Sequence, residues 1–145
     1  MACSKSYRKS TIKAYSIADQ VVAQNANVEF DNFSGTGCSI RAMGSTGVEI
    51  SKAGLYLVTV NASCSEAGTA GDITLQLNRN GVAIPGALAT DTSASETSIA
   101  NVSFCTILEV LSSCACVDNT TMLTIENIGV NATIQNVEMN VVKLC

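Results

Sequence analysis

Apolar and polar residues alternate with a period of two along most of the chain from about residue 27 onward. In residues 73–78 the side chains of Ile73, Leu75 and Leu77 share one face, while Thr, Gln and Asn side chains occupy the other. Such alternation is typical of a β-strand with one buried face. No stretch keeps a helical period over several turns. The best helical candidate is residues 16–26, where two adjacent valines fit a strand equally well.

Turn-forming residues divide the alternating pattern into short segments. The pattern predicts nine or ten strands, carried by residues 27–30, 38–42, 48–51, 55–62, 73–78, 82–84, 98–110, 122–127 and 134–144. Many short antiparallel strands at this spacing are typical of a sandwich, a jelly roll or a barrel. We predict an all-β fold, a two-sheet antiparallel jelly roll of about ten strands.

The strand predicted at residues 98–110 has two unlike faces. One face, which includes Val102, Leu108 and Val110, is almost wholly apolar. The opposite face mixes Asn, Ser and Glu side chains with Cys105 and Ile107. A face that is neither apolar nor plainly solvated indicates a second, weaker burial, such as a subunit interface.

A hairpin is predicted at Asn80 and Gly81, because both residues tolerate the left-handed backbone of a type I′ turn. The chain's single proline, Pro85, follows four residues later. We expect residues 82–84 to form a short return strand whose pairing ends at Pro85 and Gly86, which is tolerated on a sheet edge. The small polar residues 90–97 predict an exposed loop.

The composition supports one domain built from small residues. The chain has 145 residues, of which 47% are hydrophobic but only 4% aromatic, so Val, Ile, Leu and Ala must supply the core. The formal net charge is −4 and is unevenly spread. Half of the eight basic residues precede the first acidic residue, Asp19, and they are Lys5, Arg8, Lys9 and Lys13.

This distribution predicts a basic N-terminal arm, residues 1–13, in front of an acidic jelly-roll domain, residues 14–145. Such an arm is suited to an acidic partner surface or to nucleic acid, although a solvated terminus has the same composition. No apolar run has the roughly 18 residues needed to span a membrane. The start of the chain has no apolar block after its positive charges, so we expect no secretory signal peptide.

Seven cysteines, an odd number, argue against a fully paired set of disulfides. We expect Cys64 and Cys105 to be buried free thiols, since both lie within apolar strands. The spacing of Cys114 and Cys116 is not that of a structural zinc site, and the chain has no His. The sequence therefore predicts no metal and no cofactor.

The missing His also excludes the conventional Ser-His and Cys-His catalytic pairs. The twelve carboxylates are scattered singly, and the Gly-Ser-Thr-Gly turn at residues 44–47 lacks the Lys of a phosphate-binding loop. Beyond the arm there is no basic face with aromatic residues for nucleic acid. We therefore expect a protein that is not an enzyme, with neither nucleic acid nor a membrane as its partner.

Four stretches together carry a family resemblance. They read KAGLYLVTVNAS, GDITLQLNRNGVAIPGALAT, TMLTIENIG and VEMNVVKL. In this order they resemble the TNF-like jelly-roll domains, the tumour necrosis factor and complement globular-head superfamily, of bacteriophage virion proteins and of the collagen-like spore-surface proteins of Firmicutes. The match covers about residues 27–144, and its most specific parts are residues 54–60 and 75–86.

The resemblance implies a homotrimer without catalysis. The collagen stalk of the spore proteins is missing, so the chain looks more like a capsid decoration or head-fibre protein of a bacteriophage. Lys5, Arg8, Lys9 and Lys13 would then anchor it to the major capsid protein or another particle surface. The expected location is the virion surface, after assembly in the cytoplasm of the host bacterium. Two alternatives remain: a receptor- or carbohydrate-binding knob that contacts a host surface glycan, and a hydrolase with a carboxylate pair across the trimer groove.

Overall fold

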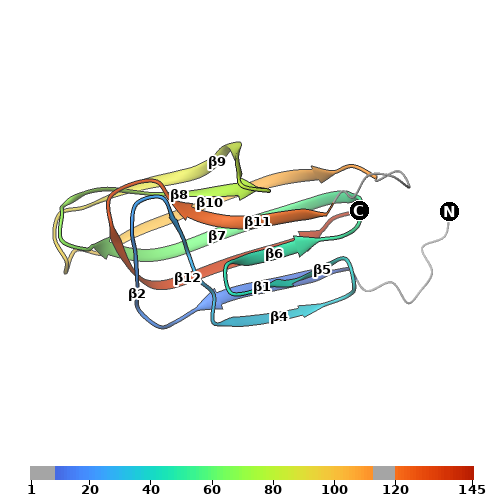
Figure 1. The fold of residues 1–145 in the computed structure, drawn as a ribbon, viewed down its shortest axis with the longest axis horizontal. Coiled ribbons are helices and arrows are strands. Elements are labelled where there is room, and N and C mark those ends of the chain that lie inside the picture. Colours follow the sequence, from blue (N-terminus) through green and yellow to red (C-terminus); the bar gives the residue numbers. More distant parts are fainter. Residues whose placement is uncertain (1–8, 113–119) are drawn as a thin grey trace.

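The computed structural model describes residues 9–112 and 120–145, which form two antiparallel sheets packed face to face (Figure 1). These residues contain twelve strands and no helix. No membrane-spanning helix is therefore found among them. The strands are β1 (Thr11–Ser16), β2 (Gln20–Val22), β3 (Ala26–Asn27), β4 (Asn32–Thr36), β5 (Ile40–Met43), β6 (Gly47–Ile50), β7 (Gly54–Glu66), β8 (Gly71–Arg79), β9 (Val82–Ser93), β10 (Ala100–Val110), β11 (Thr121–Asn127) and β12 (Ala132–Lys143).

Each sheet has six strands. Sheet 1 has the order β10-β7-β12-β1-β4, with β2 paired to the far end of β12. Sheet 2 has the order β5-β6-β11-β8-β9, with β3 paired to β11. The chain passes repeatedly from one sheet to the other, and this is the topology of a jelly roll. The predicted all-β, two-sheet antiparallel fold is therefore confirmed.

The long strands β7 and β12 form the centre of sheet 1. Their antiparallel register runs from Tyr56 opposite Lys143 to Glu66 opposite Ala132, with one bulge at Gln135. β1 joins the other edge of β12 and places Thr11 opposite Val142. The first and last strands of the chain are thus neighbours.

The core contains mostly Val, Ile, Leu and Ala side chains, as the composition predicts. Ile73, Leu75 and Leu77 are fully buried on one face of β8, in agreement with the alternating pattern. Tyr56 is the largest fully buried side chain, and its hydroxyl donates a 2.6 Å hydrogen bond to the Lys52 carbonyl. That bond satisfies the one polar group which the ring brings inside.

The two ends of the sandwich differ. At one end, the terminal end, the Lys143 amide donates a 2.9 Å hydrogen bond to the Ser10 carbonyl. Both ends of the described chain therefore lie side by side there (Figure 1). The opposite end, the distal end, carries the loops that follow β7, β9 and β11.

The structure corrects several expectations about the first 43 residues. The helical candidate at residues 16–26 instead forms part of β2 and β3, which pair with β12 and β11. β1 begins at Thr11, so residues 11–13 belong to the folded domain rather than to the arm. Residues 28–30, expected in a strand, lie outside any strand, while β4 follows at residues 32–36. Pairing with longer neighbouring strands fixes β2 and β3, whose own patterns are too short to predict them.

The hairpin between β8 and β9 forms as predicted. Asn80 and Gly81 have φ of 51° and 80°, so both adopt the left-handed backbone of the turn. The expectation that pairing ends at Pro85 is wrong. The register passes from Asn78 opposite Ala83 to Gln76 opposite Leu88, and β9 continues to Ser93.

Pro85 and Gly86 therefore lie in a bulge of a continuous strand rather than at its end. The bulge accommodates the missing amide of the proline, and β9 lies at the edge of sheet 2 as predicted. β9 also takes in the first four residues of the predicted loop at 90–97.

Gly86 has φ of 80°, a conformation that costs an L-amino acid about 1–2 kcal/mol. An added Cβ would meet no atom within 4 Å, so backbone strain is the whole cost of Gly86→Ala. We expect this substitution to lower the free energy of unfolding by about 1–2 kcal/mol in urea denaturation. Ala83→Ser, on the same strand with an ordinary φ, should change it by less than about 0.5 kcal/mol. Equal stability of the wild type and Gly86→Ala would contradict the left-handed backbone at Gly86 in this bulge.

Candidate interaction surface

The outward face of sheet 1 carries a regular arrangement of mostly uncharged side chains. The register aligns them in four rows across β10, β7 and β12. The rows are Ile107–Leu57–Val142, Cys105–Thr59–Asn140, Ser103–Asn61–Glu138 and Asn101–Ser63–Asn136. We call this arrangement the sheet 1 face.

The row nearest the terminal end is apolar. Ile107 is 64% exposed, and Leu57 and Val142 beside it are partly exposed. Leu55, next along β7, is also exposed. Exposed apolar side chains in one row form a patch rather than the scattered exposure that is normal for a protein surface.

The rows nearer the distal end are polar and neutral. Ser103 Oγ donates a 2.6 Å hydrogen bond to Asn61 Oδ1, and Ser63 Oγ donates one of 3.2 Å to Asn101 Oδ1. A shallow cavity of about 290 Å³ lies over these side chains, between β10, β7 and β12. Amide and hydroxyl groups of this kind are suited to hydrogen bonds with another polar surface.

Glu138 is the charged group at the middle of this face, and it is neutralised there. Lys13 Nζ lies 2.9 Å from Glu138 Oε2, and Asn140 Nδ2 donates a 2.6 Å hydrogen bond to Glu138 Oε1. The hydrogen bond from Lys13, together with that from Asn140, lowers the pKa of Glu138 below its ordinary value of 4.5. The Lys13 ammonium also lies 5.2 Å from the centre of the Tyr15 ring.

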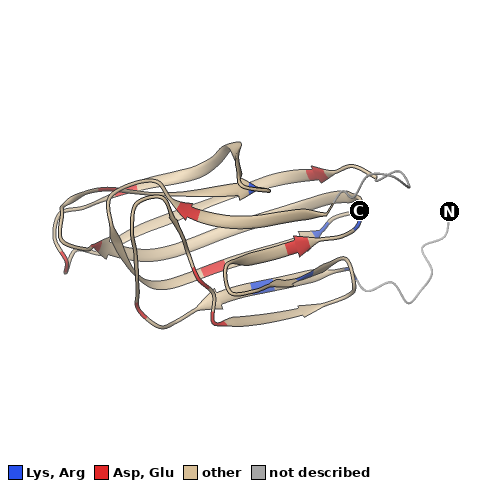
Figure 2. Cartoon of the chain, viewed as in Figure 1, with Lys and Arg blue, Asp and Glu red and all other residues tan. Residues whose placement is uncertain are grey.

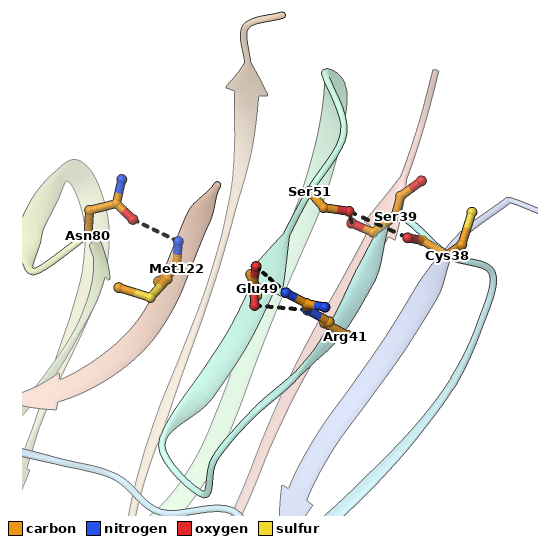
Figure 3. A network of polar contacts seen from close by, with 7 residues as sticks. All are labelled: Cys38, Ser39, Arg41, Glu49, Ser51, Asn80 and Met122. Atoms are coloured by element: carbon orange, nitrogen blue, oxygen red, sulfur yellow. Dashed lines mark hydrogen bonds and ion pairs between the residues drawn. The ribbon is translucent and has the colours of Figure 1, made fainter. Parts of the chain in front are cut away.

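The outward face of sheet 2 has a different character, because it carries an ion pair and a chain of polar hydrogen bonds. Arg41 makes two hydrogen bonds to Glu49, of 2.9 and 2.7 Å (Figure 3). Further along the face, Gln76 donates to Asn78, which in turn donates to Glu126. These polar groups are suited to solvent, and the exposed apolar side chains of Leu88 and Met122 lie apart on β9 and β11 rather than in one row. The sheet 1 face is thus the better candidate for an interface.

The predicted arm residues do not act together in the structure. Lys13 lies in β1 and forms an ion pair with Glu138, so its charge is paired within the domain. Lys9 is exposed at the terminal end. Lys5 and Arg8 lie outside the described residues, and their anchoring role stays a prediction.

The cysteine expectations are partly confirmed. Cys64 is a fully buried free thiol, and burial followed by the nearby Asp91 charge raises its pKa to about 11. Cys105 is also free but exposed, so the prediction of its burial in the core is wrong for the single chain. The alternation of β10 places Cys105 on the sheet 1 face. Cys114 and Cys116 lie outside the described residues.

Within residues 9–112 and 120–145, no group of three or more Cys, Asp and Glu side chains gathers as metal ligands would. No family model matches the sequence, and no curated protein matches it either.

Solved structures do resemble the fold. The globular domain of the zebrafish complement 1qA protein has a TM-score of 0.66 at 14% identity, over 93% of this chain and 97% of that one. Murine APRIL has a TM-score of 0.67 at 11% identity, over 94% of this chain and 100% of its own.

The Eiger TNF of S. frugiperda gives 0.65 at 14% identity, over 94% of this chain and 92% of that one. The fold is a TNF-like jelly roll. At these identities the likeness concerns the fold alone, so the structural part of the resemblance in the sequence is confirmed.

Sequence reasoning found the mixed face of β10 but not the rows that join it to β7 and β12. The period-two pattern of each strand was visible, whereas the register between strands distant in sequence was not. The Lys13–Glu138 pair was missed for the same reason, because 125 residues separate its members.

The lowered pKa of Glu138 makes this pair a source of pH-dependent stability. Its contribution is complete above the ordinary pKa of 4.5 and is lost as the pH falls through the lowered folded-state pKa. Because the pair is partly exposed, we expect Glu138→Gln to cost less than about 1 kcal/mol at neutral pH. The difference from the wild type should vanish by about pH 2 in urea denaturation.

Lys13→Gln removes the same interaction from the other side and serves as the matched control. In the double variant, the two losses should not add. Fully additive losses would mean that the two side chains do not stabilise each other.

Proposed function

We propose that this chain is a non-enzymatic structural protein that acts as a homotrimer on the surface of a particle, most specifically a bacteriophage head. The proposal combines the family resemblance in the sequence with one structural observation. That observation is the sheet 1 face, whose central carboxylate is paired with Lys13 and whose row nearest the terminal end is apolar.

The chemistry of the sheet 1 face supports burial against further copies of the chain. Covering Ile107 alone would contribute roughly 1.5–3 kcal/mol in each subunit. Because Glu138 is paired with Lys13, copies that approach through this face bring no unpaired charge from its centre. The amide and hydroxyl groups of the distal rows can form hydrogen bonds across the interface.

A closed ring of copies can form through one such face on each subunit. When the face of one copy packs against a different surface of the next, the contact repeats until the ring closes. In the proposed trimer the face of each subunit is turned toward the threefold axis. The outward face of sheet 2, with its paired charges, then remains in contact with solvent.

The terminal end supports attachment to an acidic shell. Lys9, Lys52 and Lys143 lie at this end, and neither of the two ion pairs in the described part of the chain uses them. In the sequence, Lys5 and Arg8 shortly precede Lys9 and add two further basic residues. A trimer would present three such basic groups together, which favours binding to an acidic surface.

Light scattering coupled to gel filtration tests the trimer. The wild type should have three times the mass of the chain in reducing buffer. Ile107→Asp places a charge in the apolar row, so we expect it to run as a folded monomer. Met122→Asp introduces the same charge on the outward face of sheet 2 and should remain trimeric.

Thiol labelling identifies the buried face in the same samples. Cys105 should react with a maleimide faster in Ile107→Asp than in the wild type, because only the trimer covers it. A wild-type monomer, or equal labelling of Cys105 in both proteins, would contradict the proposed interface.

The particle role has its own test. Particles sedimented from a lysate of the source culture should contain the protein, as detected by an antibody to the purified chain. Particles stripped of it should rebind the full chain but not a variant that lacks residues 1–8, which leaves β1 intact. Rebinding by the shortened trimer would remove the arm from the proposal, and absence from all particle fractions would refute the virion role.

A further inference from the structure

The described basic residues are confined to one half of the sandwich along its long axis (Figure 2). In the part of the chain that the structure describes, every basic side chain lies in the half nearer the terminal end (Figure 2). These residues are Lys9, Lys13, Arg41, Lys52, Arg79 and Lys143. Among the described residues, the charges at the distal end are acidic (Figure 2), and they include Asp72 and Asp91 at the paired ends of β8 and β9, Asp19 between β1 and β2, and Glu96 between β9 and β10. At the terminal end the three lysines Lys9, Lys52 and Lys143 outnumber the exposed Glu109, so we call it the positive end and the distal end the negative end.

The positive end is held in place by the fold. The Lys143 amide binds the Ser10 carbonyl, next to Lys9, and the Lys143 ammonium lies 5.9 Å from the centre of the Tyr56 ring. The Tyr56 hydroxyl in turn binds the carbonyl of Lys52. Lys52 and Lys143 are thus joined to one buried ring, and Lys9 directly precedes Ser10, the partner of Lys143.

The negative end combines charge with exposed apolar side chains. Ile17, Val21 and Ile99 are 73%, 71% and 53% exposed. Val21 lies opposite Thr133 at the distal end of β12, and Ile99 directly precedes the distal end of β10. The Asp91 carboxylate accepts a hydrogen bond from the Asn101 amide, which holds its charge at this end. A partner at this end would cover apolar groups and neutralise acids.

We propose that the distal end of one trimer binds the terminal end of the next, so that trimers stack end to end into a fibre. The occupant of the distal end is a second copy, because the chain itself carries the complementary basic surface. This inference rests on the proposed trimer as the repeating unit. The two ends of a trimer share one threefold axis, so three basic groups meet three acidic groups in each contact. A contact between two different surfaces along an axis does not close, and growth continues in one direction.

The same chemistry connects the stack to the particle. A basic end that fits an acidic shell also fits the acidic distal end of a trimer already bound there. The first trimer would sit on the shell, and further trimers would extend outward from it.

Sedimentation velocity of the purified full chain tests the stack. At about 20 mM NaCl we expect species heavier than the trimer, and at about 500 mM NaCl the trimer alone, because salt screens charges across the contact. Glu96→Lys at the distal end, or Lys52→Glu at the terminal end, should each weaken stacking by at least about tenfold at low salt. Mixing these two variants should restore heavier species, since each then offers the charge that the other lacks.

A double variant, Leu88→Lys with Met122→Lys, is the matched control. It changes the net charge by the same amount as Glu96→Lys, but on the outward face of sheet 2, and it should stack like the wild type. A trimer with no heavier species at low salt would overturn the stacking and leave the trimer proposal intact. Stacking that persists in Glu96→Lys, or that the control also loses, would overturn the end-to-end contact. A monomer at both salt concentrations would instead refute the trimer.

Discussion

The pairing of β12 with both β7 and β1 is the constraint on which the rest of the structure depends. It places the first and last strands of the chain side by side and fixes Ser10 next to Lys143 at one end of the sandwich. Because the register of β12 is set on both of its edges, the outward side chains of three strands fall into straight rows. The sheet 1 face and the positive end both follow from this pairing.

The core and the sheet 1 face differ in composition. With 4% aromatic residues, the chain fills its interior with Val, Ile, Leu and Ala, which fit the pleat of two closely packed sheets. The rows of the sheet 1 face combine apolar side chains at one end with amide and hydroxyl groups at the other. Such a mixture of apolar and hydrogen-bonding groups is typical of a protein–protein interface.

The distribution of charge separates the proposed roles of the surfaces. On sheet 2 Arg41 is paired with Glu49. On sheet 1 the central carboxylate of Glu138 is neutralised within the chain. At the terminal end the lysines outnumber the exposed Glu109, whereas the described charges at the distal end are acidic. Lateral contacts between copies would depend on apolar and hydrogen-bonding groups, and contacts along the axis would depend on charge.

The sequence by itself determined the all-β class, the type I′ turn at Asn80 and Gly81, and the core face of β8. Each of these follows from a period of two or from the backbone freedom of one or two residues, which are local properties. The jelly roll was predicted among three architectures with the same strand spacing, and the tertiary structure decided it. The sequence also revealed that β10 has a mixed outer face. Only the tertiary structure decided that β9 continues past Pro85 and that Lys13 belongs to β1. It likewise decided that Cys105 lies outside the core. These outcomes depend on which distant strand pairs with which, and in what register, and a local pattern does not encode that pairing.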